Sequence, residues 1–434
     1  MREIQNKGQE IYDLAKKIFP IHRSLTGEGV RKTLRVLSDY LEEDGIKMRI
    51  CEVPSGTEVF DWVIPKEWCI NSAYIEDENG EKIISVKDNN LHVVGYSMPV
   101  DKWVELEELK EVVFTQPEQK SVIPYVTSYY NERYGFCMSH NQLEKLESGK
   151  YHIVIDSELF DGSLTYADVV LPGKTKKEIM ITSYICHPSM ANNECSGPAL
   201  LSSLIKTVNS MKEREYTYRF VLGPETIGAL TYLKYNMEHL QKNLIAGIVL
   251  SCVGDNNKYS IIHSKYGNSI TDKTLLCVLK KKENFVEYSF LERGSDERQY
   301  NAAGVELPFV GFCRSKYGEY PEYHTSDDNM EFVSPDGFQG SYEAMMQWIY
   351  CMEYNGNYKM KVIGEPQLGK RGLYPTISKK GNYDAVKKMM NFIAYADGKN
   401  DLFEIANIID ASPYELLDVV DKLLENNLLG IEDC

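Results

Sequence analysis

The sequence lacks a long hydrophobic run. No stretch of its 434 residues approaches the roughly 18 consecutive apolar residues that a membrane-spanning helix needs. Residues 1–7 also lack the apolar core of a secretion signal, and no internal repeat or low-complexity tract follows. We therefore expect a globular protein of the cytoplasm that does not associate with membranes.

Positive charge is scarce. The chain carries 48 Lys and Arg against 64 Asp and Glu, which gives a formal net charge of −16 at pH 7. This excess of negative charge argues against an extended nucleic-acid-binding surface. Hydrophobic residues make up 43% of the chain and charged residues 26%, as is typical of a globular protein. At roughly 150 residues per domain, the length predicts about three domains.

Cysteine pairs with metal-binding spacing are absent. The chain has ten cysteines, but none forms a Cys-x-x-Cys pair and no zinc-finger spacing occurs. Several lie inside apolar runs, as Cys252 does in 248–253. This pattern favours reduced, buried cysteines in a cytosolic protein.

Two kinds of periodicity are present in the first third of the chain. Residues 3–18 and 29–43 have the apolar spacing of helices. From about 52 to 140, short β-type runs (58–64, 82–86 and 91–94) alternate with turn signals. This segment predicts a small β-rich domain. Its Tyr125, Tyr129 and Tyr130 are candidates to line a substrate cleft, with ordinary packing as the alternative.

Residues 150–355 alternate strand-like with helical segments. Apolar runs at 151–155, 179–183, 218–222, 244–250 and 307–311 are separated by helical spacing at 197–212, 226–240, 271–281 and 337–354. This alternation predicts an α/β fold with a mainly parallel sheet flanked by helices. Sites in such folds lie beyond the carboxyl ends of the strands.

The tail has a different pattern. Three helices are predicted at 383–396, 401–409 and 413–426, followed by an apolar run at 428–431, which is typical of a winged helix-turn-helix. The third helix would repel a phosphate backbone, because it carries four acidic side chains and a single lysine. We therefore expect the tail to contact protein. The predicted domains are an α/β domain (1–51 and 141–358), an inserted β-rich domain (52–140) and a winged-helix domain (359–434).

Candidate metal ligands follow the strand at 179–183. His187 lies on the loop after this strand, where a neutral imidazole can bind zinc, and Glu194 can add an oxygen ligand. His324, after the strand at 307–311, is the second candidate nitrogen ligand. The alternative for each histidine is a hydrogen-bonded loop residue.

Acidic side chains follow the next two strands. Glu225 lies where a strand meets a helix, and a carboxylate beside a metal there can take a proton from water. The alternative for Glu225 is a carboxylate stabilised by the helix dipole. Asp255 is a further candidate metal ligand, with an Asp-Asn-Asn turn as the alternative.

A charged loop, 292–300, supplies candidates for substrate binding. Arg293 and Arg298 can grip a carboxylate, and Asp296 can hold an amine or a metal. A solvated loop is the alternative for each of them. Taken together, His, Glu, Asp and His side chains follow successive strands of one α/β region, an order that is hard to obtain by chance.

These motifs resemble those of the co-catalytic zinc exopeptidases, the zinc aminopeptidase superfamily. The similar runs are Asn192–Gly197, Glu225–Gly228, Ser295–Glu297 and His324–Asp327. The whole chain is more similar still to a bacterial group of aminopeptidase-like proteins, often linked to polysaccharide biosynthesis, with an inserted β domain and a terminal winged helix. The runs that carry this second resemblance are Asp61–Trp68, Cys186–Ser189 and Gln367–Tyr374.

The chain departs from the superfamily at four positions. Ser189, Asn193, Thr226 and Ser251 stand where the family has acidic groups that bind or orient metal. The resemblance therefore implies an incomplete set for two zinc ions. One zinc is favoured, held by His187, Glu194 and His324, and two ions with Asp255 or Asp296 in the set are the alternative.

The resemblance implies an exopeptidase that hydrolyses an amide bond in a peptide or peptide-like substrate. Glu225 would remove the proton of an activated water and return it to the leaving amine. The alternative is a non-catalytic metal- or ligand-binding protein on a peptidase scaffold, which the four departures favour. The oligomeric state is left open, with a homo-oligomer as one option.

Overall fold

The computed structural model describes residues 4–374 and 383–432. Its strands are β1 (Arg49–Pro54), β2 (Glu58–Val59), β3 (Trp62–Val63), β4 (Glu67–Asp77), β5 (Lys82–Ser85), β6 (Val100–Glu105), β7 (Val113–Phe114), β8 (Phe136–Cys137), β9 (Lys150–Phe160), β10 (Ser163–Leu171), β11 (Glu178–Tyr184), β12 (Thr217–Gly223), β13 (Leu244–Leu250), β14 (Tyr259–Ile262), β15 (Phe285–Tyr288), β16 (Phe309–Cys313), β17 (Asn357–Met360) and β18 (Leu429–Glu432). Its α-helices are α1 (Gly8–Ile18), α2 (Glu28–Glu42), α3 (Leu106–Val112), α4 (His140–Leu143), α5 (Ser196–Ser210), α6 (Ile227–Asn243), α7 (Ile270–Leu279), α8 (Glu297–Tyr300), α9 (Pro335–Glu353), α10 (Tyr383–Tyr395), α11 (Leu402–Ile408) and α12 (Pro413–Glu425).

An eight-stranded sheet forms the centre of the molecule, in the order β1-β10-β12-β11-β13-β16-β14-β15. The four middle strands, β12, β11, β13 and β16, are parallel to one another. Their carboxyl ends therefore lie along one edge of the sheet. The chain passes from β11 to β12 on one side and then to β13 on the other, so the strand order reverses there, as it does at the ligand sites of open α/β sheets. The α/β fold with a mainly parallel sheet is confirmed.

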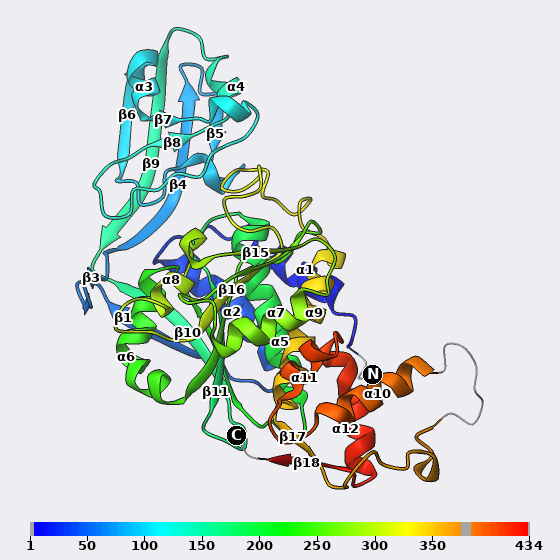
Figure 1. Ribbon diagram of the computed structural model, residues 1–434. Helices are drawn as coiled ribbons and strands as arrows, with labels where there is room; N and C mark the ends of the chain where they lie inside the picture. Colours follow the sequence, from blue (N-terminus) through cyan, green and yellow to red (C-terminus); the bar gives the residue numbers. More distant parts are fainter. Residues whose placement is uncertain (1–3, 375–382, 433–434) are drawn as a thin grey trace.

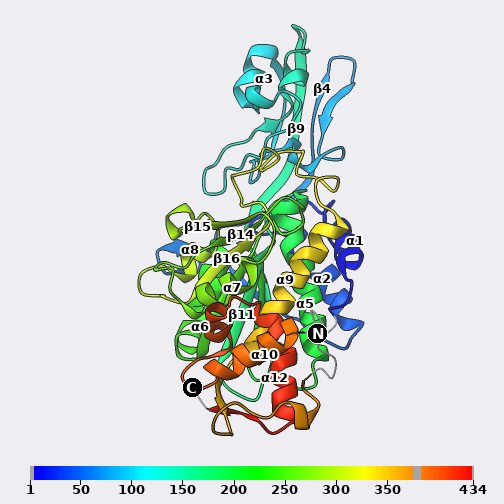
Figure 2. The same cartoon turned by 45° about the vertical axis from the view of Figure 1, so that its right-hand side comes forward.

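Both faces of this sheet are buried, because its central strands are apolar along their whole length. In β11, Ile179 and Ile181 pack into the core that contains α1, α2, α5, α7 and α9, whereas Met180 packs into the core that contains α6. Figures 1 and 2 show these helices on the two sides of the sheet. This double burial is typical of parallel strands.

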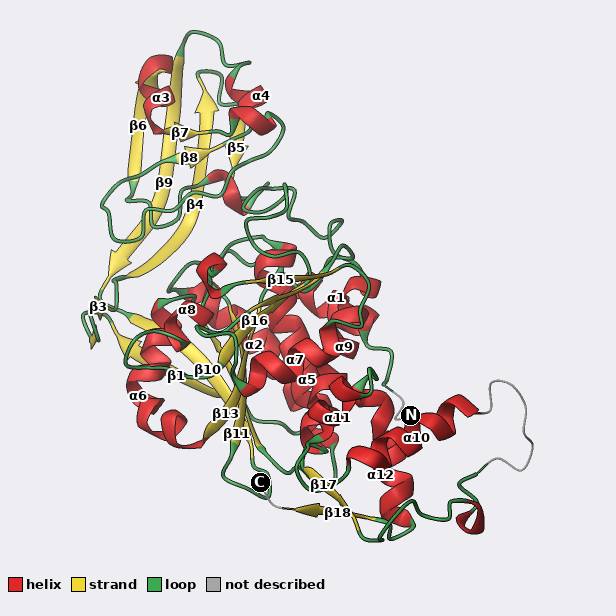
Figure 3. Cartoon of the chain, in the orientation of Figure 1, coloured by secondary structure: helices red, strands yellow, loops and turns green. Residues whose placement is uncertain are grey.

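A second sheet forms a separate lobe above the first (Figures 1 and 3). It has four strands in the order β5-β4-β9-β6, and all of its pairs are antiparallel. The sequence analysis assigned the run at 151–155 to the α/β region, and this assignment is wrong: β9 pairs with β4 and β6 in the second sheet. The domain boundaries at 51/52, 140/141 and 358/359 stay a prediction.

The tail folds as three helices and a two-stranded sheet of β17 and β18 (Figure 3). Its apolar side chains belong to the same core as α7 and α9, and Tyr414 of α12 stacks on Tyr350 of α9. The tail and the α/β region thus share a core. The helices predicted at 383–396, 401–409 and 413–426 agree with α10, α11 and α12. Cys434, the last of the ten cysteines, lies outside the described residues. Among the described helices, none has the length and apolar character needed to cross a bilayer.

Candidate functional site

The loops that follow β11, β12, β13 and β16 meet at one edge of the large sheet. The loop after β11 carries His187 and leads through a short π-helix, residues 191–195, into α5. Glu225 lies between β12 and α6, and His324 follows β16. Parallel pairing of the strands therefore brings together side chains that are up to 137 residues apart in the sequence.

Glu194 holds His187 in a defined orientation. Its Oε2 lies 2.7 Å from His187 Nδ1, and its Oε1 accepts the backbone N–H groups of Cys186 and His187. Both residues are almost completely buried. A carboxylate on Nδ1 fixes which ring nitrogen carries the proton and leaves Nε2 with its lone pair toward the site.

The free nitrogen of His187 faces Glu225. The distance between His187 Nε2 and Glu225 Oε2 is 3.9 Å. Burial raises the pKa of Glu225, and the negative charge of Glu194 raises it further, although His187 acts in the opposite direction. A carboxyl group with a raised pKa is suited to accept and return a proton.

His324 is the third member of this group. Its ring centroid lies 5.3 Å from that of His187, and its Nε2 is buried without a hydrogen-bond partner. Tyr323 stacks on one side of the ring at 3.8 Å, and Tyr125 meets it edge-on at 5.0 Å. Burial and the nearby His187 lower the pKa of His324 to about 2. A buried, neutral imidazole with an unpaired nitrogen is a ready ligand for a metal or a polar substrate.

His187, Glu194, Glu225 and His324 form what we call the open cluster, because three of them, His187, Glu225 and His324, line a cavity. This cavity has a volume of about 410 Å³. The second lobe contributes to its wall, as the sequence analysis proposed for three of its tyrosines. The lining residues are Leu25, Trp62, Tyr125, Thr127, Tyr129, Tyr130, Cys186, His187, Glu225, Thr226, Ile227, Arg298 and His324.

A second group of polar side chains lies beside it, after β11 and β13. The Tyr184 hydroxyl is hydrogen-bonded to Ser251 Oγ and accepts from Asn193 Nδ2 at 2.8 Å. We call Tyr184, Asn192, Asn193, Ser251, Asp255 and Asp328 the closed cluster, because its hydroxyl and carboxylate groups bond to partners within the protein. The exception is Asn193 Oδ1, which is buried without a partner.

The structure does not bring Asp255 into the cavity. Its Oδ1 accepts from Asn257 N and Ser315 Oγ, and its Oδ2 accepts from Asn192 Nδ2 and Ser315 N, all at 2.9 to 3.0 Å. Asp328 is similarly occupied by the N–H groups of Asn192 and Asn193 and by the Tyr320 hydroxyl. These carboxylates hold the loops together.

The three candidates for substrate binding occupy different positions. Asp296 is buried and accepts the Thr226 N–H at 2.7 Å. Arg298 lines the cavity and donates to Thr226 Oγ1 at 2.6 Å. Arg293 is exposed, lies over the Phe290 ring, and is absent from the described lining of the cavity.

Four of the described non-glycine residues with positive φ lie at this edge of the sheet. Ser189, Thr226, Cys252 and His324 have φ between 43° and 64°, which L-residues with side chains rarely adopt. Thr226 is the clearest case, because it is β-branched and has φ 64° and ψ −75°. Such strain persists where the surrounding structure imposes it, and it clusters at functional sites.

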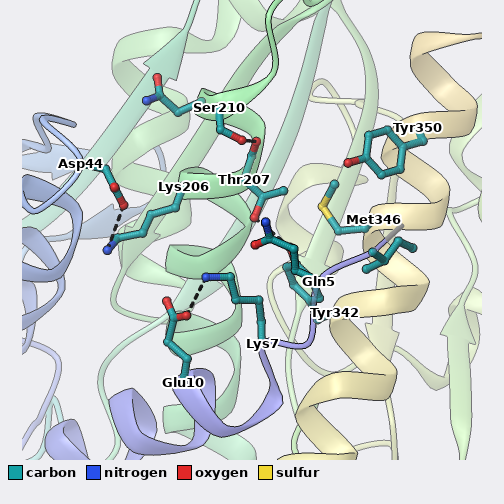
Figure 4. Close-up of a pocket in the computed structure, with 12 residues that line it drawn as sticks. Gln5, Lys7, Glu10, Asp44, Lys206, Thr207, Ser210, Tyr342, Met346 and Tyr350 are labelled. Atoms are coloured by element: carbon teal, nitrogen blue, oxygen red, sulfur yellow. Dashed lines mark hydrogen bonds and ion pairs between the residues drawn. The ribbon is translucent and has the colours of Figure 1, made fainter. Parts of the chain in front are cut away.

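A larger hollow of about 560 Å³ lies between α1, α5 and α9 (Figure 4). Its charged groups are paired with each other: Lys7 bonds to Glu10 at 2.6 Å, and Lys206 bonds to Asp44 at 3.0 Å. It contains no histidine or cysteine among its described lining residues. Its greater volume does not make it the better site, because no unpaired reactive group faces it.

The donor set of the open cluster fits zinc. Imidazole nitrogen and carboxylate oxygen are the ligand types of catalytic zinc sites, and His324 Nε2 is a buried donor without a partner. Cys186 Sγ, His187 and Glu194 also offer ligand atoms within 4.8 Å of one another. The closed cluster does not fit a second ion, because it has no histidine or cysteine and its carboxylates, Asp255 and Asp328, are not among the described lining residues of the cavity.

Two residues of the site have no signal in the sequence that points to it. Tyr184 ends an apolar strand and has the sequence signal of a core residue, and Trp62 lies in a two-residue strand of the connection to the second lobe. Glu194 was expected to bind metal, whereas the structure assigns both of its oxygens to Cys186 and His187.

Comparisons with known proteins agree with this architecture. Residues 12–355 match the family model described as "Domain of unknown function (DUF4910)", and residues 357–430 match a winged helix-turn-helix model. A Clostridium acetobutylicum protein named "Putative polysaccharide biosynthesis protein with aminopeptidase-like domain" is 43% identical over 410 residues, 93% of this chain and 92% of that protein.

Two solved structures are informative. A crystal structure described as a "putative peptidase" from Clostridium acetobutylicum has a TM-score of 0.90 and 40% identity, and the match covers 98% of this chain and 97% of that one. A zinc aminopeptidase from Bacillus subtilis has a TM-score of 0.59 at 13% identity, covering 80% of this chain and 96% of that one. The second similarity concerns the fold alone.

Proposed function

The chain belongs to the DUF4910 family, combined with a C-terminal winged helix, and on this premise we propose that it is a metal-dependent hydrolase of amide bonds. The observation that carries the proposal is the open cluster. His187 Nε2, the Glu225 carboxylate 3.9 Å away and the unpartnered His324 Nε2 belong to residues that line one cavity of an aminopeptidase-like fold.

One zinc ion is the cofactor that this donor set favours. The nitrogens of His187 and His324 would hold it together with a carboxylate oxygen of Glu194, which would give up a hydrogen bond to Cys186 or His187 for the ion. Glu225 would then stay free to act as the base. When bound, zinc supplies a Lewis acid that polarises the amide carbonyl. The protonated Nδ1 of His187, fixed by Glu194, keeps the Nε2 lone pair directed toward the cavity.

Glu225 acts as the general base and then as the general acid. It takes one proton from a water molecule whose oxygen bonds to the acyl carbon. The C–N bond breaks, and Glu225 returns the proton to the leaving nitrogen. The products are a carboxylic acid and an amine. Burial keeps the pKa of Glu225 raised, which favours the return of the proton.

The test is the metal content of the purified protein, measured by elemental analysis, beside the double variant His187→Ala, His324→Ala. We expect about one zinc per chain, lost in the variant. The matched control is His152→Ala, His239→Ala, because these histidines pair with Glu76 and Glu178 away from the cavity. Absence of metal from the wild-type protein after incubation with zinc would overturn the proposal.

The second candidate function is ligand binding without hydrolysis. The neutral side chains of Asn193, Thr226 and Ser251 and the occupied oxygens of Asp255 favour it. In that case the cavity would bind a peptide or an acylated amino sugar, in line with the name of the Clostridium relative, which links that protein to polysaccharide biosynthesis. Bound substrate analogues that are never cleaved, even by the zinc-loaded protein, would support this candidate.

The cytoplasm is the proposed compartment. Seven of the nine described cysteines are buried, as expected where thiols stay reduced. The acidic face of α12, with Glu415, Asp418, Asp421 and Glu425 against Lys422, supports a protein contact over a nucleic-acid contact for the tail. A homo-oligomer stays a prediction.

A further inference from the structure

The charges that line the cavity are few. Apart from the two histidines, Glu225 and Arg298 are its charged lining residues within the described part of the chain. Glu225 is assigned to proton transfer. Arg298 is therefore the one group on the wall that can select the charge of a bound molecule.

The Arg298 guanidinium has N–H donors that form no hydrogen bond with the described residues. It uses Nη2 for one hydrogen bond, to Thr226 Oγ1, and within the described residues it forms no ion pair shorter than 4.0 Å. A guanidinium has five N–H donors in a planar fork that matches a carboxylate. Two parallel donors thus remain for an anionic group that enters the cavity.

Thr226 fixes the position of this guanidinium beside Glu225. Its N–H donates to the buried Asp296 and its Oγ1 accepts from Arg298, so the strained residue is held from both sides. Asp296 is 3% exposed and is not among the lining residues, which leaves it unsuited to meet an ammonium group of a substrate. The other charged side chain on the cavity wall near Glu225 is therefore the cation Arg298.

Part of the cavity wall is aromatic. Trp62 and Tyr130 meet edge to face with ring centroids 6.1 Å apart and are 39% and 51% exposed. The Tyr125 and Tyr129 hydroxyls lie 2.7 Å from each other. Exposed aromatic faces of this kind bind flat or apolar parts of a ligand, with hydroxyls available at their edges.

We propose that the cavity takes N-acylated compounds with a free carboxylate, held by Arg298, with an apolar or ring portion on Trp62 and Tyr130. N-acyl amino acids and N-acylated amino sugar acids share this chemistry. Arg298 would repel the positive charge of a substrate with a free terminal amine. This inference rests on the proposed function for the cleavage step, but the binding preference is independent of it.

Titration calorimetry measures binding without cleavage, so it tests the binding preference separately from the proposed hydrolysis. The probes are N-acetyl-L-tyrosine, its carboxamide N-acetyl-L-tyrosinamide, and L-tyrosinamide with a free amine. For sugars, the binding of N-acetylmuramic acid, which has a carboxylate, is compared with that of N-acetylglucosamine, which has none. We expect each acid to bind at least ten-fold more tightly than its neutral or cationic counterpart. Arg298→Gln should remove this preference and leave carboxamide binding unchanged.

Two further variants serve as comparisons. Arg35→Gln removes an exposed arginine that pairs with Glu28 outside the cavity and should keep the preference. Arg293→Gln tests the other candidate arginine, and a loss of preference there but not in Arg298→Gln would overturn the assignment. Tighter binding of L-tyrosinamide than of either acid would overturn the inference and leave a hydrolase of free-amine substrates. Tight binding of an acid that the zinc-loaded protein never cleaves would sustain the inference and refute the proposed hydrolysis.

Discussion

The open and closed clusters lie side by side at the same edge of the sheet, yet they differ in how their polar atoms are used. In the open cluster, His324 Nε2 has no partner and His187 Nε2 has only Glu225 at 3.9 Å. In the closed cluster, each carboxylate oxygen of Asp255 and Asp328 accepts a hydrogen bond. Each cluster contains one unsatisfied buried atom, Asn193 Oδ1 in the closed cluster and His324 Nε2 in the open one, but only the residue in the open cluster lines the cavity and can gain a partner there.

This difference agrees with the proposal that a single ion binds in the open cluster. Asn193 and Ser251, two of the positions at which the sequence resemblance implies acidic groups, lie in the closed cluster. The Tyr184 hydroxyl bonds to both of them, so neutral hydrogen bonds join the loops after β11 and β13. The comparison therefore assigns chemistry to one cluster and stability to the other.

The largest expected effect comes from Glu225→Gln. Glutamine keeps the shape of the side chain but cannot accept the proton of water, so amide hydrolysis should fall by about 10²- to 10⁴-fold. Zinc content, measured in the same preparation, should stay unchanged if Glu194 is the carboxylate ligand. Glu238→Gln, an exposed position on α6, is the control. Full activity in Glu225→Gln would end the assignment of Glu225 as base.

Glu194→Gln is the next most severe change. Gln cannot offer two carboxylate oxygens to His187 Nδ1 and to the N–H groups of residues 186 and 187, so the imidazole loses its fixed orientation. We expect zinc affinity, or activity at limiting zinc, to fall about 10- to 100-fold. Competition with a chelator of known affinity measures the change. An equal loss in a variant of the closed cluster would contradict the division between the clusters.

Much of this edge of the sheet could be predicted from the sequence. His187, Glu225 and His324 were found because each follows an apolar strand, and parallel strands end at one edge. The hydrogen-bond partners of a carboxylate cannot be predicted in this way. Nothing in the sequence indicates that Asp255 bonds to Ser315 and Asn192 and is therefore turned away from the cavity. Periodicity identified the run at 151–155 as a strand but could not assign it to a sheet, because β-pairing is decided by distant segments.

Tyr184→Phe should affect the closed cluster alone. The change removes the hydroxyl between Ser251 Oγ and Asn193 Nδ2 and leaves the buried amide with the weaker acceptor Cys252 Sγ at 3.7 Å. We expect the free energy of unfolding to fall by about 1–3 kcal/mol, with zinc content unchanged and hydrolysis within a few-fold of wild type. Denaturant unfolding beside a metal assay measures both. A loss of zinc in this variant would show that the two clusters act as one site.

The smallest effect is expected in the hollow of Figure 4, where Lys206→Met removes a charge without shortening the side chain appreciably. Lys206 Nζ bonds to Glu43 and Asp44 at 3.0 Å each and lies over the Tyr40 ring at 3.7 Å. Its partners are 69% and 53% exposed, so water can replace the lost ion pairs. We expect a loss of at most about 1 kcal/mol, reduced further at high salt, and no change in zinc content or hydrolysis. A loss of hydrolysis here, with the fold intact, would show that this hollow takes part in function although its charges are paired.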